Sequence, residues 1–232
     1  MNPIPIVPEK DQILSLFENH KKEICLNDFP YITGLRRKAL ESFAINGFPN
    51  QSLEKWRNTN IVQSLTRSYN FHFSPFEGKV DIDKIFRCEI HNFETYMFTQ
   101  LNGWYIYNQS PLTELPNGVI VGSMASALKA YPDIASMHYG KYAAFNDNGM
   151  IAMNTAFAQD GIFIFVPDNV IIEKPIQMVN IVNINEDIFI QPRNLIVLGK
   201  NSKLTLVYCD DSIKHKSSFI NSVTEVYVDE DS

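Results

Sequence analysis

The residues best suited to bind a metal ion lie near the end of the sequence, where Cys209, Asp210 and Asp211 precede His215. A thiolate, two carboxylates and an imidazole at the end of a strand are ligands for a transition metal. No second cysteine or histidine lies nearby in the sequence, two lysines flank His215, and a closed site needs about four ligands. We therefore interpret this segment as a strand that contains a buried cysteine and ends in an Asp-Asp turn, and we assign no metal site.

Catalytic motifs are absent from the rest of the sequence. The ten glycines form neither a P-loop nor a G-x-G-x-x-G dinucleotide motif, and there is no G-x-S-x-G or H-E-x-x-H segment. Among five widely spaced histidines, we interpret His20 as part of a solvated helix face and His138 as a core or capping residue. Carboxylate pairs such as Asp81 and Asp83 suit glycoside chemistry, although turns commonly carry such pairs. The sequence thus assigns no catalytic, cofactor-binding or metal-ligating residue.

The composition is that of a folded, soluble protein. Hydrophobic residues make up 45% of the 232 residues and charged residues 20%, which excludes an intrinsically disordered chain. The net charge of −6 argues against nucleic acid as a partner, because nucleic-acid-binding surfaces are basic. No apolar run reaches the roughly 18 residues that cross a membrane, and no signal peptide is visible. Three scattered cysteines exclude a disulfide framework, so we expect a cytoplasmic protein in a reducing compartment, with no membrane partner.

Helical periodicity dominates the first of three parts of the chain, residues 1–60. It predicts a helix from Glu9 to about Glu23, a second from Thr33 to Asn46, and a short one that begins at Ser52. The apolar residues of the second helix form one stripe, and this places Arg36 among the side chains that face solvent.

The second part, residues 61–160, is a mixed α/β segment that leads into the core. Strands are predicted at Thr95–Leu101 and Trp104–Tyr107, and the Asn102-Gly103 pair between them is a hairpin signal. A further strand is predicted at Val119–Val121, and two or more helical stretches follow it.

The third part, residues 161–232, alternates short strands with turns and shows no helical pattern, which disfavours a doubly wound α/β sheet. A β-sandwich, a barrel and a β-solenoid remain, and the unequal lengths between strands favour a solenoid. The last strand ends close to Ser232 without a capping segment, so we expect the front part of a longer protein. The predicted strands are Ile162–Val166, Val170–Ile172, Ile176–Val182, Ile188–Ile190, Leu195–Leu198, Leu204–Cys209 and Thr224–Val228.

Two stretches combine residue types in an order that composition does not explain. Arg37–Thr59 contains Asn-Gly-Phe-Pro followed by Leu-Glu-Lys-Trp-Arg-Asn-Thr. Asn154–Ile176 contains Asn-Thr-Ala-Phe, then Gln-Asp-Gly, Val-Pro and Glu-Lys-Pro-Ile, and the segments at Pro192–Leu195 and Cys209-Asp210 continue the pattern. Together they resemble the N-terminal signature and the start of the β-helix in the SufB/SufD family of iron–sulfur cluster assembly proteins. The first stretch favours the SufD branch over the SufB branch.

The resemblance implies an α+β N-terminal region over residues 1–160 and the first coils of a right-handed parallel β-helix over residues 161–232, with later coils and a C-terminal helical domain absent. It implies a non-catalytic scaffold subunit, not an enzyme, which pairs with a SufB-like β-helix paralogue and a SufC-like ABC ATPase to support iron supply and cluster assembly. Clusters and ATP would then be handled by partner subunits, and this chain would carry no cofactor.

Two alternatives stay open from the residues. The strands and acidic turns of residues 161–232 also suit a β-solenoid carbohydrate-active enzyme, and a cofactor-free structural interaction module fits the same pattern. A solenoid without its final coils exposes unpaired strand edges, so we further expect the chain to self-associate through that end.

Overall fold

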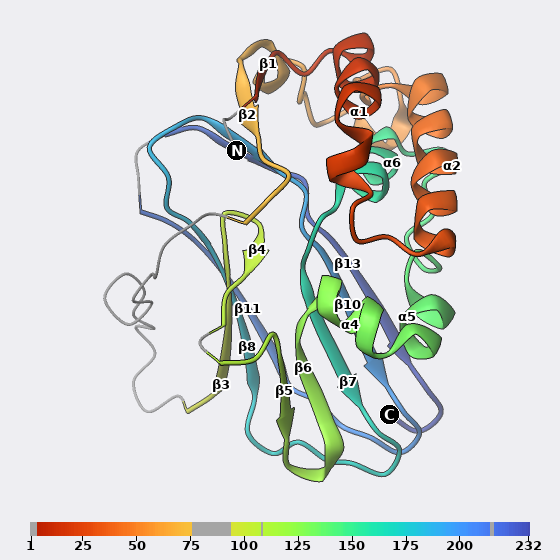
Figure 1. The fold of residues 1–232 in the computed structure, drawn as a ribbon, viewed down its shortest axis with the longest axis vertical. Coiled ribbons are helices and arrows are strands. Elements are labelled where there is room, and N and C mark those ends of the chain that lie inside the picture. Colours follow the sequence, from red (N-terminus) through yellow and green to blue (C-terminus); the bar gives the residue numbers. More distant parts are fainter. Residues whose placement is uncertain (1–3, 76–93, 108, 214–215) are drawn as a thin grey trace.

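The computed structural model describes residues 4–75, 94–107, 109–213 and 216–232. It is a mixed α+β fold in which three β-sheets contain both parallel and antiparallel strands, with helices gathered along one side (Figure 1). This confirms the mixed class predicted from the sequence. Within these ranges, no helix has the length and apolar character needed to span a membrane.

The two predicted N-terminal helices are confirmed, as are the helical stretches expected before Gln159. The short third helix is a single 3-10 turn at Glu54–Trp56. Asn148 caps the last helix, because its side-chain oxygen accepts hydrogen bonds from the backbone N–H groups of Met150 and Ile151. The α-helices are α1 (Lys10–Ile24), α2 (Pro30–Asn46), α4 (Met124–Ala130), α5 (Pro132–His138) and α6 (Gly149–Phe157).

Arg36 on α2 is buried, and the prediction that it faces solvent is wrong. Its side chain donates from Nε to Asp28 Oδ2 (2.8 Å) and from Nη1 to the carbonyl oxygen of Ala156 (2.9 Å). The apolar stripe could not reveal this, because α6 packs against α2 and covers a face that the stripe alone leaves open. A carboxylate and a carbonyl satisfy the buried guanidinium there.

The strands form three sheets. The first has the order β1-β2-β9-β12, the second β11-β8-β3-β4, and the third β13-β10-β7-β6-β5. The bounds are β1 (Ile4–Ile6), β2 (Tyr69–Phe71), β3 (Tyr96–Leu101), β4 (Trp104–Tyr105), β5 (Leu112–Leu115), β6 (Val119–Ser123), β7 (Ile162–Val166), β8 (Ile176–Val182), β9 (Ile188–Ile190), β10 (Arg193–Leu198), β11 (Leu206–Ser212), β12 (Ser218–Ile220) and β13 (Val223–Val228).

From β8 onward the chain visits the second, first and third sheets in turn, and then repeats the circuit. Each strand of the second circuit lies parallel to its counterpart in the first. The partner residues are Ile176 and Leu206, Ile188 and Ser218, and Leu195 and Glu225. The same offset of 30 residues in all three sheets makes the two circuits successive layers of one stack.

The two ends of this stack differ. At one end each sheet finishes in antiparallel strands: β1 in the first, β4 in the second, and β6 with β5 in the third. At the other end the outermost strands β11, β12 and β13 each have a paired strand on one side only. We call these three strands the open edge.

The helices cover the outer faces of two sheets. Aromatic rings of the first sheet, Phe71 and Phe189, pack with Phe157 of α6 and Phe17 of α1. The outer face of the third sheet packs against α4 and α5. The inner faces of the second and third sheets meet in a separate apolar cluster that includes Phe98, Ile164, Val166, Ile176, Met178, Ile196 and Leu198.

Most predicted strand positions are confirmed, including the hairpin at Asn102-Gly103 and the bounds of β7, β8 and β9. Three predictions are wrong. Val170–Ile172 forms only an isolated bridge through Ile171, and Asp210-Asp211-Ser212 continues β11 instead of making a turn. Cys209, predicted to be buried, is only half-buried because β11 is the outermost strand of its sheet. Asp210 is held in the strand because its carboxylate accepts a hydrogen bond from Asn180 on the neighbouring strand (2.9 Å).

The corner after the third sheet repeats with each layer. Asn169, Asn201 and Asp231 occupy equivalent turns, and all three have positive φ angles of 61°, 52° and 59°. Asn201 Nδ2 donates to Asn169 Oδ1 (3.1 Å), so the amides form a ladder along the stack. Asparagine suits this position because it adopts the left-handed conformation more readily than most residues.

We predict that Asp231→Asn raises the free energy of unfolding by about 0.5–1 kcal/mol, because the new amide extends the ladder to Asn201. Asn201→Ala should lower it by about 1–2 kcal/mol, since alanine is strained at positive φ and the ladder bond is lost. Urea titration of both variants measures the two effects. An Asp231→Asn protein no more stable than the parent would contradict the ladder.

Candidate functional site

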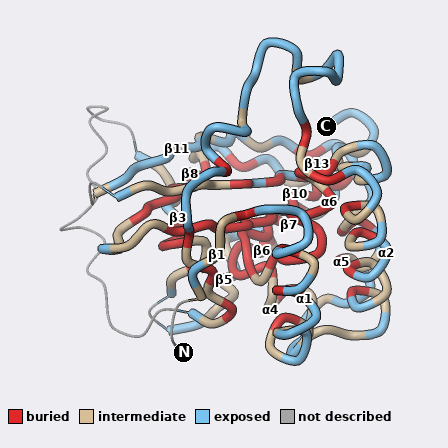
Figure 2. Tube along the Cα trace, turned by 90° about the horizontal axis from the view of Figure 1, so that it is seen from above, coloured by how far each residue is buried: buried red, intermediate tan, exposed pale blue. Residues whose placement is uncertain are grey.

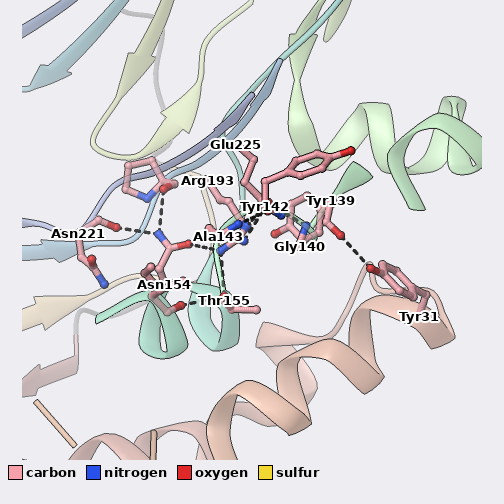
Figure 3. Close-up of polar contacts among 12 residues, drawn as sticks. Tyr31, Tyr139, Gly140, Tyr142, Ala143, Asn154, Thr155, Arg193, Asn221 and Glu225 are labelled. Atoms are coloured by element: carbon pink, nitrogen blue, oxygen red, sulfur yellow. Dashed lines mark hydrogen bonds and ion pairs between the residues drawn. The ribbon is translucent and has the colours of Figure 1, made fainter. Parts of the chain in front are cut away.

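A buried ion pair joins the last two strands of the third sheet. Arg193 on β10 and Glu225 on β13 both have fully buried side chains, and Arg193 Nη2 lies 2.9 Å from Glu225 Oε2 (Figure 3). Arg193 Nη1 donates to Asn154 Oδ1 (3.0 Å) and Thr155 Oγ1 (2.9 Å) on α6. The guanidinium therefore makes hydrogen bonds both within the third sheet and to α6. We call Asn154, Thr155, Arg193, Asn221 and Glu225 the buried network.

The Glu225 carboxylate also fixes the loop that follows α5. It accepts hydrogen bonds from the backbone N–H groups of Gly140, Tyr142 and Ala143 at 2.8–3.0 Å. The preceding residue, Tyr139, presents its ring to Arg193 at 5.2 Å, and its carbonyl oxygen accepts a hydrogen bond from Tyr31 of α2. One carboxylate thus connects β13, this loop and, through Tyr139, the helix α2.

Amide side chains extend the buried network to the turns before β10 and β13. Asn154 Nδ2 donates to the carbonyl oxygens of Pro192 (2.9 Å) and Asn221 (2.7 Å). Asn221 Nδ2 in turn donates to the carbonyl of Met150 (2.9 Å) and to Gln191 Oε1 (2.7 Å). The two donors of each amide are used, so these side chains have a structural task and no free donor for a ligand.

Asp160 makes a second junction next to the buried network. Its carboxylate accepts hydrogen bonds from the hydroxyl of Ser123 (2.8 Å) and the backbone N–H groups of Ala125 and Tyr105 (3.1 Å each). Burial raises the pKa of this carboxyl, and these hydrogen bonds oppose the shift. Gly161 follows, and a Cβ there would collide with the carbonyl oxygen of Arg193. The Asp-Gly pair therefore lets β7 approach β10.

A polar layer crosses the inside of the stack. Asn194 Oδ1 accepts from Gln100 Nε2 (2.9 Å) and from the backbone of Ile162 (2.8 Å), and its Nδ2 donates to Thr224 (3.1 Å). Asn180 and Asp210 make the corresponding link in the second sheet. These hydrogen bonds connect successive layers inside the stack and fix their register.

The open edge carries apolar side chains that the stack covers elsewhere. Leu206, Tyr208, Val226 and Val228 are 36–52% exposed, although their register partners Ile176, Met178, Ile196 and Leu198 belong to the buried inner cluster. Figure 2 shows β11 largely as an exposed strand. The open edge combines unpaired backbone groups with half-exposed apolar residues, which is the chemistry of a surface for strand addition.

Comparison with known proteins identifies the family. The model for the SufBD protein N-terminal region matches residues 7–178. The chain belongs to the SufB/SufD family. Several residues of the motifs that resemble this family lie in the buried network or beside the Asp160 junction. They are Asn154, Thr155, Gly161 and Arg193.

Individual relatives of this SufBD-family chain are iron–sulfur cluster assembly proteins by name. The SufBD family protein PH1385 of Pyrococcus horikoshii is 24% identical over 226 residues, which cover 93% of this chain and 50% of the relative. ABCI9 of Arabidopsis thaliana is 31% identical over 53% of this chain and 26% of its own length, and SufB of Bacillus subtilis is 30% identical over 48% and 24%. The chain spans half or less of these relatives.

In the described part of this SufBD-family chain, the residues considered as metal ligands from the sequence are not arranged as a metal site. Cys209 and Asp210 are consecutive in β11 and point to opposite faces, and Cys209 Sγ accepts from Gln177 (3.4 Å). His215, like Asp81 and Asp83, lies outside the described residues. Across the ranges that are described, no three His, Cys, Asp or Glu side chains are arranged to hold a metal ion.

Burial shifts the pKa of two other titratable groups toward the neutral form. His138 is buried at the end of α5 with Nδ1 2.6 Å from the Tyr142 hydroxyl, and burial lowers its pKa. This agrees with the interpretation of His138 as a core or capping residue. Burial also raises the pKa of the Cys25 thiol, which disfavours the thiolate that binds metal ions.

We predict that Glu225→Gln lowers the free energy of unfolding by about 3–5 kcal/mol, because it leaves the Arg193 guanidinium buried without a counter-charge. The matched control is Glu230→Gln, which breaks the exposed pair with Lys200 and should cost less than about 1 kcal/mol. Chemical denaturation of the parent and both variants makes the comparison. Equal losses in the two variants would show that the buried network does not depend on the charge of Glu225.

Proposed function

We propose that this SufBD-family chain is a non-catalytic scaffold subunit of a Suf-type iron–sulfur cluster assembly complex, and that it belongs to the SufD branch. The observation that carries the proposal is the open edge, which is a regular surface for strand pairing. The buried network of the same chain holds its layers together, and its amide side chains offer no free donor for a ligand. The Arg37–Thr59 stretch supports the SufD branch.

The stack is, in this proposal, the beginning of a right-handed parallel β-helix. Its support is the common offset of 30 residues in all three sheets and the repeated left-handed corner at Asn169, Asn201 and Asp231. The right hand is the one that connections between parallel strands take in nearly all proteins. A further layer with the same offset would pair with β11, β12 and β13 and bury the half-exposed apolar residues there.

The partners we propose are a SufB-like β-helix paralogue and a SufC-like ABC ATPase. The chain has no P-loop, so ATP hydrolysis falls to the ATPase. Iron and the assembled cluster are cargo of the complex, and this chain supports their handling without a cofactor of its own. Its free thiols, Cys25 and Cys209, suit a reducing compartment such as the cytoplasm.

We predict that antibody capture of the endogenous protein from a cell extract recovers an ABC-type ATPase and a SufB-like paralogue. Quantitative mass spectrometry of the retained proteins gives the measurement, and an extract from cells that lack this chain gives the background. Capture of the protein alone, from an extract in which both proposed partners are abundant, would overturn the scaffold function.

We also propose that the isolated 232-residue chain associates with a second copy through the open edge. Association should strengthen with added salt, because the acidic residues at this end repel their copies until salt screens them. They are Asp210, Asp211, Asp229, Glu230 and Asp231.

Sedimentation velocity over a range of protein and salt concentrations tests this association. Val226→Lys should abolish it by placing a charge among the apolar residues of the open edge. Ile45→Lys, at a position 82% exposed on α2, is the control and should have no effect. A monomer at every concentration would contradict association, and loss of association in the control would place it elsewhere on the chain.

A further inference from the structure

Four Asn-Gly pairs occur in the chain, and the structure separates one of them from the other three. They are Asn46-Gly47, Asn102-Gly103, Asn117-Gly118 and Asn148-Gly149. Such a pair is prone to deamidation, because glycine leaves the following backbone nitrogen unhindered and free to approach the asparagine side chain. Whether the reaction occurs depends on how firmly the structure holds the side chain and the glycine nitrogen.

Three of the pairs are held. Asn46 Nδ2 donates to the carbonyl oxygens of Ser42 and Asn146, and the N–H of Gly47 donates to Phe43 at the end of α2 (2.7 Å). The buried Asn102 exchanges hydrogen bonds with the backbone of Asn183 in both directions.

Asn148 is the third. It uses Oδ1 to cap α6, and a Cβ on Gly149 would collide with the backbone of Gly47, so no space is left for rearrangement.

Asn117 differs from these three in the freedom of its side chain. It lies in the three-residue loop between β5 and β6, which forms the single 3-10 turn Pro116–Gly118. Its side chain is exposed and makes no hydrogen bond to any part of the chain that the structure describes. The loop connects to β5, the outermost strand of the third sheet, which is only partly buried. Exposed loops at sheet edges open at low free energy, so this pair can leave its turn while the core stays folded.

We propose that Asn117 is a site of spontaneous covalent modification, the first asparagine of this protein to deamidate. The backbone nitrogen of Gly118 loses its proton to solvent and attacks Cγ of Asn117. The new N–C bond closes a succinimide ring, and the bond from Cγ to the side-chain nitrogen breaks and releases ammonia. Water then opens the ring at either carbonyl, which gives aspartate or isoaspartate.

The product changes both charge and backbone length in a loop of three residues. Either product adds a negative charge, and isoaspartate also adds one methylene to the main chain. Leu115 and Val119 are paired across this loop, and Asn117 and Gly118 have φ angles of 66° and 76°. An extra backbone atom disturbs such a turn, so β5 should become easier to detach from the sheet while the buried network is unaffected.

The test is incubation of the full-length folded chain at mildly alkaline pH, with peptide mapping by mass spectrometry at intervals. Asn117 should convert at least about tenfold faster than Asn46, Asn102 or Asn148, which serve as controls inside the same molecule. Isoaspartate should be found at position 117, and hydrogen exchange in β5 should rise as it accumulates. Asn117→Gly keeps a residue that tolerates positive φ and should abolish the early product.

A synthetic peptide of residues 113–121 gives the deamidation rate of Asn117 in the absence of the folded structure. The proposal is overturned if any other Asn-Gly pair in the folded protein converts as fast as Asn117. It is also overturned if Asn117 remains intact in the protein after the peptide has converted fully, because the loop would then be held closed.

Discussion

The ion pair between Arg193 and Glu225 is the interaction on which the other layers depend. Two charges with no exposed surface are tolerated only when nearly all of their hydrogen-bonding groups have partners, and here those partners come from different elements. Asn154 and Thr155 connect the pair to α6, and the backbone around Gly140 connects it to the loop after α5. The pair itself joins β10 to β13. Separating β10 from β13 leaves both buried charges unpaired, and separating α6 or the loop after α5 leaves their hydrogen-bonding groups unsatisfied. The ion pair therefore favours one arrangement of the helices and the stack.

The stack that this ion pair helps to hold has two different ends. Antiparallel strands end the sheets at one end, and the helices cover the outer faces of the first and third sheets. The open edge is left as the place where strands can add. Asp160, at the junction next to the buried network, is paired with Ser123 and the backbone of Ala125. Such an arrangement suits a protein that works through assembly, and it is the physical basis of the scaffold function proposed above.

The motifs that revealed the family have structural roles in this chain. Gly161 allows the close approach of β7 to the carbonyl of Arg193, and Asn154 holds the turns before β10 and β13. Asn194, next to Arg193, connects three layers of the stack from the inside. A recognisable motif therefore need not mark an active site. Here the motif marks buried residues whose packing and hydrogen bonds few other residue types could reproduce.

The sequence by itself determined the mixed class, both N-terminal helices, the bounds of β7, β8 and β9, and the family, because local periodicity, turn residues and motif order carry that information. It failed at Arg36 and at Asp210-Asp211-Ser212, where the outcome depends on a partner distant in the chain: α6 and Asp28 bury the arginine, and Asn180 keeps the acidic residues in a strand. The pairing of Arg193 with Glu225 was equally invisible, since nothing local indicates that a side chain 32 positions further along the chain lies diagonally opposite on the neighbouring strand. Only the tertiary structure decides which polar groups meet, because the register of stacked layers is a property of the whole fold.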